Sequence, residues 1–320
     1  MRILVTGGFG SLGTAAIREL LERGHRVRCL ELRNRATRKR QRQLGDGVET
    51  IWADVCDPVQ VTAAVEGQDA VLHMAAILFP DSETQPERAR AVNVDGTSNV
   101  LDAMVASPKR PVLVFPSSIT VHGKGRFEGE ERRADEPVSP GHHYARHKVE
   151  CEERIRDSGV PWTIFRIGVA VEPGASAKLT TEALRTMFAV SPNARAEFVH
   201  PADVALAMAN AVIRPEARSK VLMIGGGPSC QVLQRDLIAA GTEALGIGML
   251  PREAFGDEGF EMDWMDTSES QRILEFQRCS FEEFRADFRH NVRLQRWALL
   301  PLRPLVRRAM LHFSQPWRDR

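Results

Sequence analysis

A tyrosine and a lysine four residues apart are the most direct sign of chemistry in this sequence. Tyr144 is the single tyrosine of the chain, and Lys148 follows it. On a helix, two residues at this spacing share one face. A nearby ammonium group favours the phenolate and lowers the pKa of a tyrosine from about 10. We therefore expect Tyr144 to act as a general acid and base, although such pairs also arise by chance on any helix.

Ser118 is the third candidate for a reacting group. It follows an apolar run at residues 111–115 that predicts a buried strand. Open α/β sheets bind ligands at the carboxyl ends of their strands, which is where Ser118 is expected. Its hydroxyl would donate a hydrogen bond to a carbonyl oxygen while Tyr144 transfers the proton.

The first thirteen residues carry a glycine pattern that is typical of phosphate binding. Residues 3–5 predict a short buried strand, and residues 14–21 predict a helix. Gly8, Gly10 and Gly13 form G-x-G-x-x-G between them. A pyrophosphate can approach backbone N–H groups where no Cβ intervenes, and the helix N-terminus favours an anion. A plain turn is the alternative, and the strand-turn-helix context favours a dinucleotide site. The expected pyrophosphate ligands are Gly7, Gly10, Ser11, Leu12 and Gly13.

The end of the second predicted strand, residues 26–31, bears on the choice between two cofactors. Its last residue, Glu31, stands where an acid binds the adenosine ribose hydroxyls, which favours NAD. A basic run follows, and Arg33 is our candidate for binding the 2′-phosphate of NADP. The other interpretation of the run is a solvated basic face, which we favour. NAD is therefore the expected cofactor, with NADP as the alternative.

Other candidate cofactor ligands follow the next strands. Asp54 and Val55 come after the predicted strand at residues 48–52, where a carboxylate could accept from the adenine amino group. Asp57 precedes Pro58, a pattern typical of a helix cap. The remaining expected cofactor contacts are Ala75 and Ala76 after the strand at 70–73, Asn93 in a helix at 86–105, Tyr144 and Lys148.

The order of these segments predicts an α/β protein with a Rossmann-type, doubly wound parallel sheet. Strand and helix alternate six times, ending with a strand at residues 162–166. We expect a Rossmann domain over residues 1–167 and a smaller C-terminal α/β substrate region over 168–320. In that region the pattern predicts a strand at 221–224, a turn at 225–228, and helices at 177–188, 199–212, 233–245 and 281–292.

Composition excludes several classes of protein. The chain has 320 residues, a net charge of +1 and 43% hydrophobic residues, which gives no case for nucleic-acid binding. The five cysteines show no C-x-x-C spacing, so we expect buried, reduced thiols in a cytoplasmic protein and no metal site. No apolar run is long enough to span a bilayer, and we expect no signal peptide.

The C-terminal segment, residues 294–320, alternates large apolar residues with arginines. A basic amphipathic stretch can lie on an anionic membrane. Pro301 and Pro304 interrupt it, and we favour a tail that packs on its own domain or on a partner subunit. Peripheral membrane contact is the alternative.

Together these motifs resemble the extended short-chain dehydrogenases/reductases, the NAD-dependent epimerase/dehydratase family. The resemblance covers residues 1–212 and rests on the glycine loop, Asp54 and Tyr-x-x-x-Lys, together with His73-Met-Ala-Ala, Asn93-Val-Asp-Gly-Thr, Ser117-Ser118 and Phe198-Val-His-Pro-Ala-Asp-Val. It implies a catalytic triad of Ser118, Tyr144 and Lys148, bound NAD(P), a small-molecule substrate and often a homodimer.

The resemblance also bears on substrate. Ser118-x-Thr120 is similar to the pattern of sugar-nucleotide epimerases, and Ile119-Thr120 stands where the dehydratases carry Asp-Glu. We assign Thr120, Ile167 and Gly168 to substrate binding. His122 replaces the family's usual tyrosine, and Ile167 its usual proline. The stretch at 173–198 is short for a nucleotide-sugar site.

Three hypotheses for function follow. The first is an NAD-dependent oxidoreductase that epimerises a nucleotide sugar by transient hydride transfer. The second is an NAD(P)H-dependent dehydrogenase or reductase of a small carbonyl or alcohol, which the short stretch favours. The third, a non-catalytic nucleotide-binding protein, is disfavoured by the intact Ser118, Tyr144 and Lys148.

Overall fold

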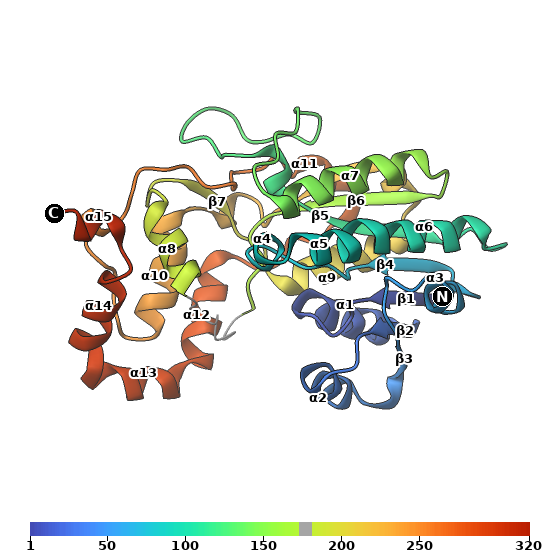
Figure 1. Cartoon of the computed structure of the whole chain (residues 1–320), viewed down its shortest axis with the longest axis horizontal. Helices are drawn as coiled ribbons and strands as arrows, with labels where there is room; N and C mark the ends of the chain where they lie inside the picture. Colours follow the sequence, from blue (N-terminus) through green and yellow to red (C-terminus); the bar gives the residue numbers. More distant parts are fainter. Residues whose placement is uncertain (173–180) are drawn as a thin grey trace.

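A seven-stranded parallel sheet forms the centre of the computed structural model, which describes residues 1–172 and 181–320 (Figure 1). The strand order is β3-β2-β1-β4-β5-β6-β8, so the direction of winding reverses between β1 and β4. Such a switch point opens a crevice at the carboxyl ends of the strands. The bounds are β1 Arg2–Thr6, β2 Arg26–Glu31, β3 Val48–Trp52, β4 Ala70–His73, β5 Val112–Ser118, β6 Trp162–Ile167 and β8 Lys220–Ile224. The predicted Rossmann-type parallel sheet is confirmed.

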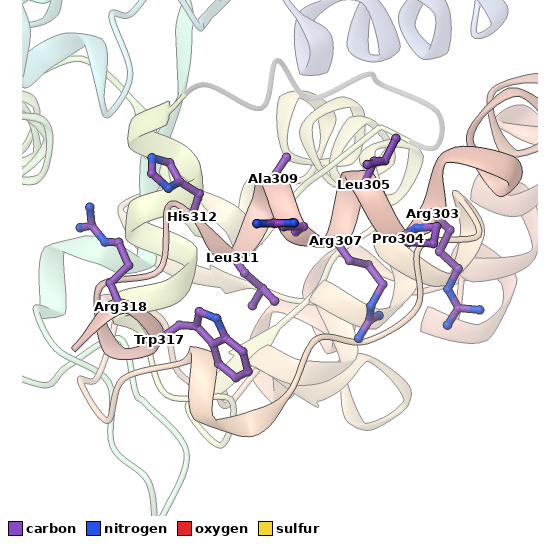
Figure 2. Close-up of a pocket in the computed structure, with 10 residues that line it drawn as sticks. Arg303, Pro304, Leu305, Arg307, Ala309, Leu311, His312, Trp317 and Arg318 are labelled. Carbon is purple, nitrogen blue, oxygen red and sulfur yellow. The ribbon is translucent and has the colours of Figure 1, made fainter. Parts of the chain in front are cut away.

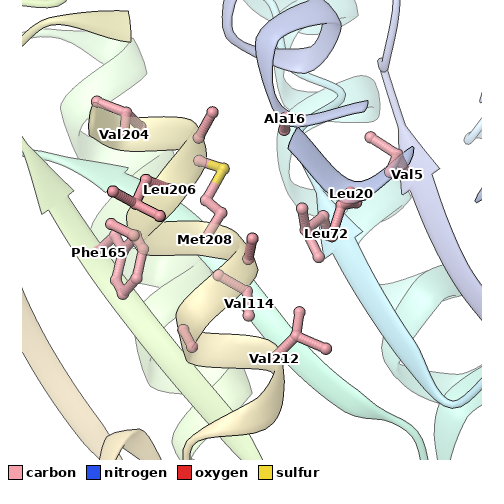
Figure 3. Close-up of a cluster of buried hydrophobic side chains, with 14 of the residues drawn as sticks. Val5, Ala16, Leu20, Leu72, Val114, Phe165, Val204, Leu206, Met208 and Val212 are labelled. Atoms are coloured by element: carbon pink, nitrogen blue, oxygen red, sulfur yellow. The ribbon is translucent and has the colours of Figure 1, made fainter. Parts of the chain in front are cut away.

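Helices cover both faces of the sheet because side chains alternate along each strand. In β1, Ile3 and Val5 belong to one buried cluster and Leu4 to the other. The first cluster is covered by α1 (Ser11–Glu22) and α9 (Pro201–Ile213), as Figure 3 shows for Leu20 and Met208. The second is covered by α3 (Pro58–Val65), α6 (Gly96–Ala106) and α7 (His143–Asp157).

Most predicted elements are present, with differences at their ends. β2, β3 and β4 have the predicted bounds, whereas β5 runs on to Ser118 and β6 to Ile167. The helix predicted at 86–105 is α5 (Pro86–Arg90), a π-helical turn at Ala91–Asp95, and α6. Of the helix predicted at 177–188, residues 177–180 lie outside the described residues, and the rest is α8 (Thr181–Ala189). Asp57 caps α3 as expected, by accepting from the N–H groups of Val59 and Gln60.

The sheet does not end at the predicted domain boundary. After β6 the chain leaves the sheet and returns to it as β8, which pairs with β6 in parallel. The smaller region has its own antiparallel pair, β7 (Arg195–Glu197) and β9 (Gln231–Leu233). Its helices lie at the end of the molecule away from α3 (Figure 1). They are α8, α10 (Gln234–Ala244), α12 (Phe281–Asn291), α13 (Arg293–Leu299), α14 (Arg303–Leu311) and α15 (Gln315–Arg318).

The cysteines require one correction. All five are free thiols, but Cys56 is exposed and Cys279 is only half-buried. The expectation of buried thiols is therefore wrong for Cys56, because it lies in the turn between β3 and α3, where the chain leaves the sheet.

Candidate active site

A cleft of about 510 Å³ opens at the carboxyl ends of the strands and collects most of the predicted site residues. The glycine loop and the first turns of α7 both line it. The predicted residues that line it are Gly7, Gly10, Ser11, Leu12, Gly13, Glu31, Asp54, Val55, Ala75, Ala76, Ser118, Tyr144, Lys148, Ile167 and Gly168. Segments far apart in sequence thus meet in one site.

The glycine loop fits a dinucleotide. A Cβ on Gly7 would lie 2.7 Å from Ala75 Cα, and Gly7 has a φ of +64°. A Cβ on Gly13 would lie 2.7 Å from Gly8 Cα. Gly10 caps α1 without any side-chain hydrogen bond, so the N–H groups of the first helical turn are open to the cleft. This arrangement suits a pyrophosphate.

Glu31 is fixed at the edge of this loop. Its carboxylate accepts hydrogen bonds from Phe9 N at 3.1 Å and from Leu32 N at 3.0 Å. Burial raises the pKa of Glu31, and these two hydrogen bonds oppose that rise. A carboxylate held here can accept from ribose hydroxyls and would repel a 2′-phosphate.

The predicted phosphate ligand Arg33 does not line the cleft. The basic run forms α2 (Arg35–Leu44), which buries no residue and matches the solvated basic face that we favoured. Arg40 from this helix donates to Phe9 O instead. The arginine that does line the cleft is Arg88 on α5, which no pattern in the sequence distinguishes from its neighbours.

Two other predicted residues act beside the cleft and not in it. Asn93 lies in the π-helical turn, where its Oδ1 accepts from Ile77 N at 2.7 Å and its Nδ2 donates to Ile77 O at 2.9 Å. It thereby fixes Ile77, which lines the cleft. Thr120 Oγ1 donates to Ser118 Oγ at 3.0 Å and does not line the cleft itself.

The three candidate catalytic residues have distinct environments. Tyr144 lies in the first turn of α7, Lys148 one turn later, and Ser118 at the end of β5. The Lys148 ammonium donates to Pro116 O at 2.6 Å and lies 4.4 Å from the centroid of the Phe115 ring.

The pKa of Tyr144 is the main correction to our expectations. We expected Lys148 to lower it, but burial raises it instead. The ammonium lies 5.6 Å from the centroid of the tyrosine ring and is directed to Pro116 O. Burial likewise lowers the pKa of Lys148 to about 8. In this state the phenol is therefore a proton donor.

A buried histidine supports the floor of the cleft. His73 Nδ1 lies 2.7 Å from Thr6 Oγ1, and its Nε2 lies 3.0 Å from Thr97 Oγ1. Burial lowers the pKa of His73 to about 3, with a smaller effect from Lys148, so the ring is neutral. Thr6 Oγ1 also accepts from Ala75 N at 3.2 Å, which fixes the loop after β4.

A second buried network lies beneath Ser118. Arg166 donates to both oxygens of Glu152, at 3.1 and 2.7 Å. Ser117 Oγ donates to Glu152 Oε1 at 2.6 Å. Arg166 Nη1 also lies 3.0 Å from His122 Nε2, which is neutral because burial, and then Arg166, lower its pKa to about 4. His122, a departure from the family pattern, is thus an acceptor for Arg166. Our sequence reasoning missed this network, although Lys148-x-x-x-Glu152 places Glu152 on the same face of α7.

Aromatic ring contacts connect Tyr144 with the lining of a second cavity. The ring of His142 stacks on the ring of Tyr144 with their centroids 6.0 Å apart. The centroid of the Phe79 ring lies 5.0 Å from that of His142. His142 Nε2 is 2.7 Å from Glu261 Oε2. Beyond Phe79 is a cavity of about 250 Å³. Its described lining carries no charged side chain and consists of Phe79, Pro80, Thr186, Met187, Val190, Gln234 and Phe260.

The sequence pattern of one protein family matches this chain over the sheet and its helices. The match to the NAD dependent epimerase/dehydratase family spans residues 3–225. The chain belongs to this family. Membership confirms the family that the sequence motifs resemble.

Individual relatives are more distant. The chain is 35% identical over 162 residues to 3 beta-hydroxysteroid dehydrogenase type 7 of Rattus norvegicus. The matched stretch covers 48% of this chain and 46% of the rat protein. The chain thus spans about half the length of the curated relatives that it matches.

Solved structures share the fold along almost the whole chain. A short-chain dehydrogenase/reductase superfamily protein from Agrobacterium tumefaciens, with bound NAD, has a TM-score of 0.75 and 22% identity, covering 93% of this chain and 98% of that one. UDP-glucose 4-epimerase from Thermus thermophilus, in complex with NAD, has a TM-score of 0.74 and 22% identity, covering 92% and 99%. At these identities the likeness shows the fold.

Proposed function

We propose that this family member binds NAD in the cleft and interconverts a secondary alcohol and its ketone. The observation that carries the proposal is that Ser118, Tyr144 and Lys148 line the same cleft as the glycine loop. Glu31, held by the N–H groups of Phe9 in the glycine loop and of Leu32, favours NAD over NADP. When bound, NADH would supply the hydride in reduction and NAD⁺ would accept it in oxidation.

The residues of this chain handle the proton and the substrate oxygen. Ser118 Oγ accepts hydrogen bonds from Thr120 N at 3.3 Å and from Thr120 Oγ1 at 3.0 Å. Its own proton is therefore free to be donated to a carbonyl oxygen. Tyr144 gives a proton to that oxygen in reduction and removes it in oxidation. Lys148, fixed on Pro116 O, contributes positive charge beside the forming phenolate.

The cavity beyond Phe79 supports an uncharged, largely apolar substrate. Its described lining has no arginine or lysine to pair with a diphosphate. A net dehydrogenase or reductase of an apolar carbonyl or alcohol is therefore our leading hypothesis for the site. The hydroxysteroid dehydrogenase among the relatives is named for a substrate of that chemical kind.

Epimerisation of a nucleotide sugar is the second candidate. The two polar residues of the Ser-x-Thr pattern, Ser118 and Thr120, are joined by a hydrogen bond. A protein that shares the fold is a UDP-glucose 4-epimerase. The candidates differ in cofactor turnover. An epimerase regenerates NAD in each cycle and keeps it bound through dialysis, whereas a net reductase exchanges it.

Replacing the Tyr144 hydroxyl tests the chemistry. Tyr144→Phe should lower kcat by about 10²- to 10⁴-fold, because general acid-base catalysis contributes that much, while the Kd for NADH stays the same. Turnover would be followed by NADH absorbance with a panel of apolar ketones and by product analysis with UDP-sugars. Ser229→Ala, which removes a hydroxyl outside the cleft, is the matched control. Full turnover by Tyr144→Phe would disprove the catalytic assignment.

Two other expectations stay predictions. A cytoplasmic location is supported by five free thiols, and a homodimer by the family resemblance alone. Size measurement in solution tests the second.

A further inference from the structure

The C-terminal helices expose a surface that the proposed chemistry does not use. Leu294, Trp297, Leu302 and Leu305 are 74%, 75%, 48% and 66% exposed. Arg293 and Arg308 are exposed beside them. We call these six residues the tail surface.

The opposite side of the same segment is packed, so the exposure is not a sign of loose structure. Met310 is buried, and Val306 and Leu311 pack with it against the cluster that contains Phe188 of α8. Figure 2 shows Leu305 and Ala309 on one side of α14 and Leu311 on the other. In Figure 1, α13 and α14 form the outer edge of the molecule. The segment is thus an amphipathic structure with a second apolar face that points outwards.

The arginines of this segment fall into two groups. Arg296 donates to Glu243 O in the last turn of α10 at 2.6 Å. Arg303 and Arg307 donate to Ile247 O, just after that helix, at 3.1 and 3.0 Å. They hold the tail on its own domain, as we favoured from the sequence. The side chains of Arg293 and Arg308, by contrast, make no hydrogen bond or ion pair with the described parts of the chain.

The free arginines share helical faces with the exposed apolar residues. Arg293 and Trp297 are four residues apart on α13, and Leu305 and Arg308 are three apart on α14. Residues 288–318 contain seven arginines and no aspartate or glutamate, although the net charge of the chain is only +1. The surface therefore suits a partner that is both apolar and negatively charged.

We propose that the tail surface docks on an anionic lipid bilayer. Leucine and tryptophan side chains would enter the headgroup region while Arg293 and Arg308 contact lipid phosphates and acidic headgroups. A second copy of the chain, joined by a two-fold axis, would bring a second set of these arginines to the interface, and residues 288–318 offer no aspartate or glutamate to pair with them. A nucleic acid offers no apolar layer for four exposed large side chains. None of the helices in the described ranges has the length and apolar content to cross a bilayer.

Vesicle co-sedimentation of the full chain tests this directly. We expect binding to phosphatidylcholine vesicles that contain phosphatidylserine, weak binding to phosphatidylcholine alone, and loss of binding at high salt. Arg293→Gln with Arg308→Gln should weaken binding by about 30-fold, because each arginine near such a surface contributes a factor of about five. Leu294→Ser with Trp297→Ser should weaken it by at least about 10-fold.

Matched controls separate the tail surface from general effects. Arg38→Gln with Arg42→Gln removes the same charge from α2, and Val59→Ser removes an apolar residue that is 77% exposed on α3. Neither should change vesicle binding. NADH affinity should be unaffected by the tail variants. A failure of the membrane proposal can therefore be distinguished from a failure of the proposed function. The proposal is overturned if the wild-type chain does not bind anionic vesicles at low salt, if the controls weaken binding equally, or if light scattering shows self-association that the leucine and tryptophan changes disperse.

Discussion

The arginines beneath the cleft and the arginines of the tail have opposite surroundings. Arg166 is 4% exposed in its side chain and forms two hydrogen bonds with Glu152, which is 1% exposed. In the tail, Arg307 donates to three consecutive carbonyls, of Ile247, Gly248 and Met249. Arg308, the next residue, is exposed. The first region satisfies its charge internally and fixes a geometry, whereas the second leaves charge for a partner.

Glycine shows the same contrast. In the loop before α1 and in the first turn of that helix, a Cβ added to Gly7 or Gly13 would lie closer than 3.0 Å to backbone atoms. A Cβ added to Gly241 in α10 would have no atom within 4 Å. The glycines of the cleft are therefore required by close contact, and that of α10 is not.

Breaking the buried ion pair between Glu152 and Arg166 should cause the largest loss of stability. Glu152→Gln leaves Arg166 buried without a carboxylate, and we expect the free energy of unfolding to fall by about 3–5 kcal/mol. Urea unfolding measures this. Glu282→Gln, which removes the exposed partner of Arg285 on α12, should cost about 1 kcal/mol or less. Equal losses for the two variants would contradict the comparison.

Filling the glycine loop should remove cofactor binding. In Gly13→Ala the new methyl group would lie 2.7 Å from both Gly8 Cα and Gly8 O. We expect NADH affinity to fall by about 100-fold or more, with a stability loss of about 1–3 kcal/mol from overpacking. NADH fluorescence titration measures the first and thermal unfolding the second. Unchanged NADH affinity would show that the loop does not bind the cofactor.

The buried lysine should cost stability while serving the site. Its pKa is lowered to about 8 from an ordinary value near 10.5, so the unfolded chain binds more protons between these values. The cost is full below about pH 8 and is relieved as the pH rises to about 10.5. Lys148→Met should raise the free energy of unfolding at pH 7 by about 1–3 kcal/mol and should lower turnover. The stability gain should shrink from about pH 8 to about pH 10.5, and a gain that is independent of pH would contradict this explanation.

The smallest change tests the open glycine of α10. Gly241→Ala should raise the free energy of unfolding by about 0.5–1 kcal/mol, because alanine is the better helix former and meets no atom. Thermal unfolding should show a slightly higher Tm with unchanged NADH binding. A loss of stability would mean that α10 packs more tightly than the structure shows.

The sequence predicted those parts of the site that depend on local pattern. Three strands were predicted to the residue, and each begins within three residues after a glycine: Gly24 before β2, Gly47 before β3 and Gly67 before β4. The glycine loop follows from spacing alone. Arg33 and Arg88 show the limit. Whether an arginine reaches the cleft depends on how α2 and α5 pack, which sequence spacing does not contain.

Burial and long-range contacts are the other properties of the site that the sequence did not predict. The pKa of Tyr144 was predicted from its neighbour Lys148, but the direction is set by how many protein atoms surround the phenol. The His122–Arg166 contact joins residues 44 apart in sequence, and nothing local indicates it. Both are properties of tertiary packing.

The most direct test of the central claim is the binding of NADH and NADPH to the purified chain, after any nucleotide that it retains has been released and identified. We predict one NADH bound per chain, with weaker binding of NADPH because the Glu31 carboxylate would repel a 2′-phosphate. Retained NAD would agree with this and favour the epimerase candidate. Absence of both retained and added nucleotide, or tighter binding of NADPH, would contradict the assignment of this cleft.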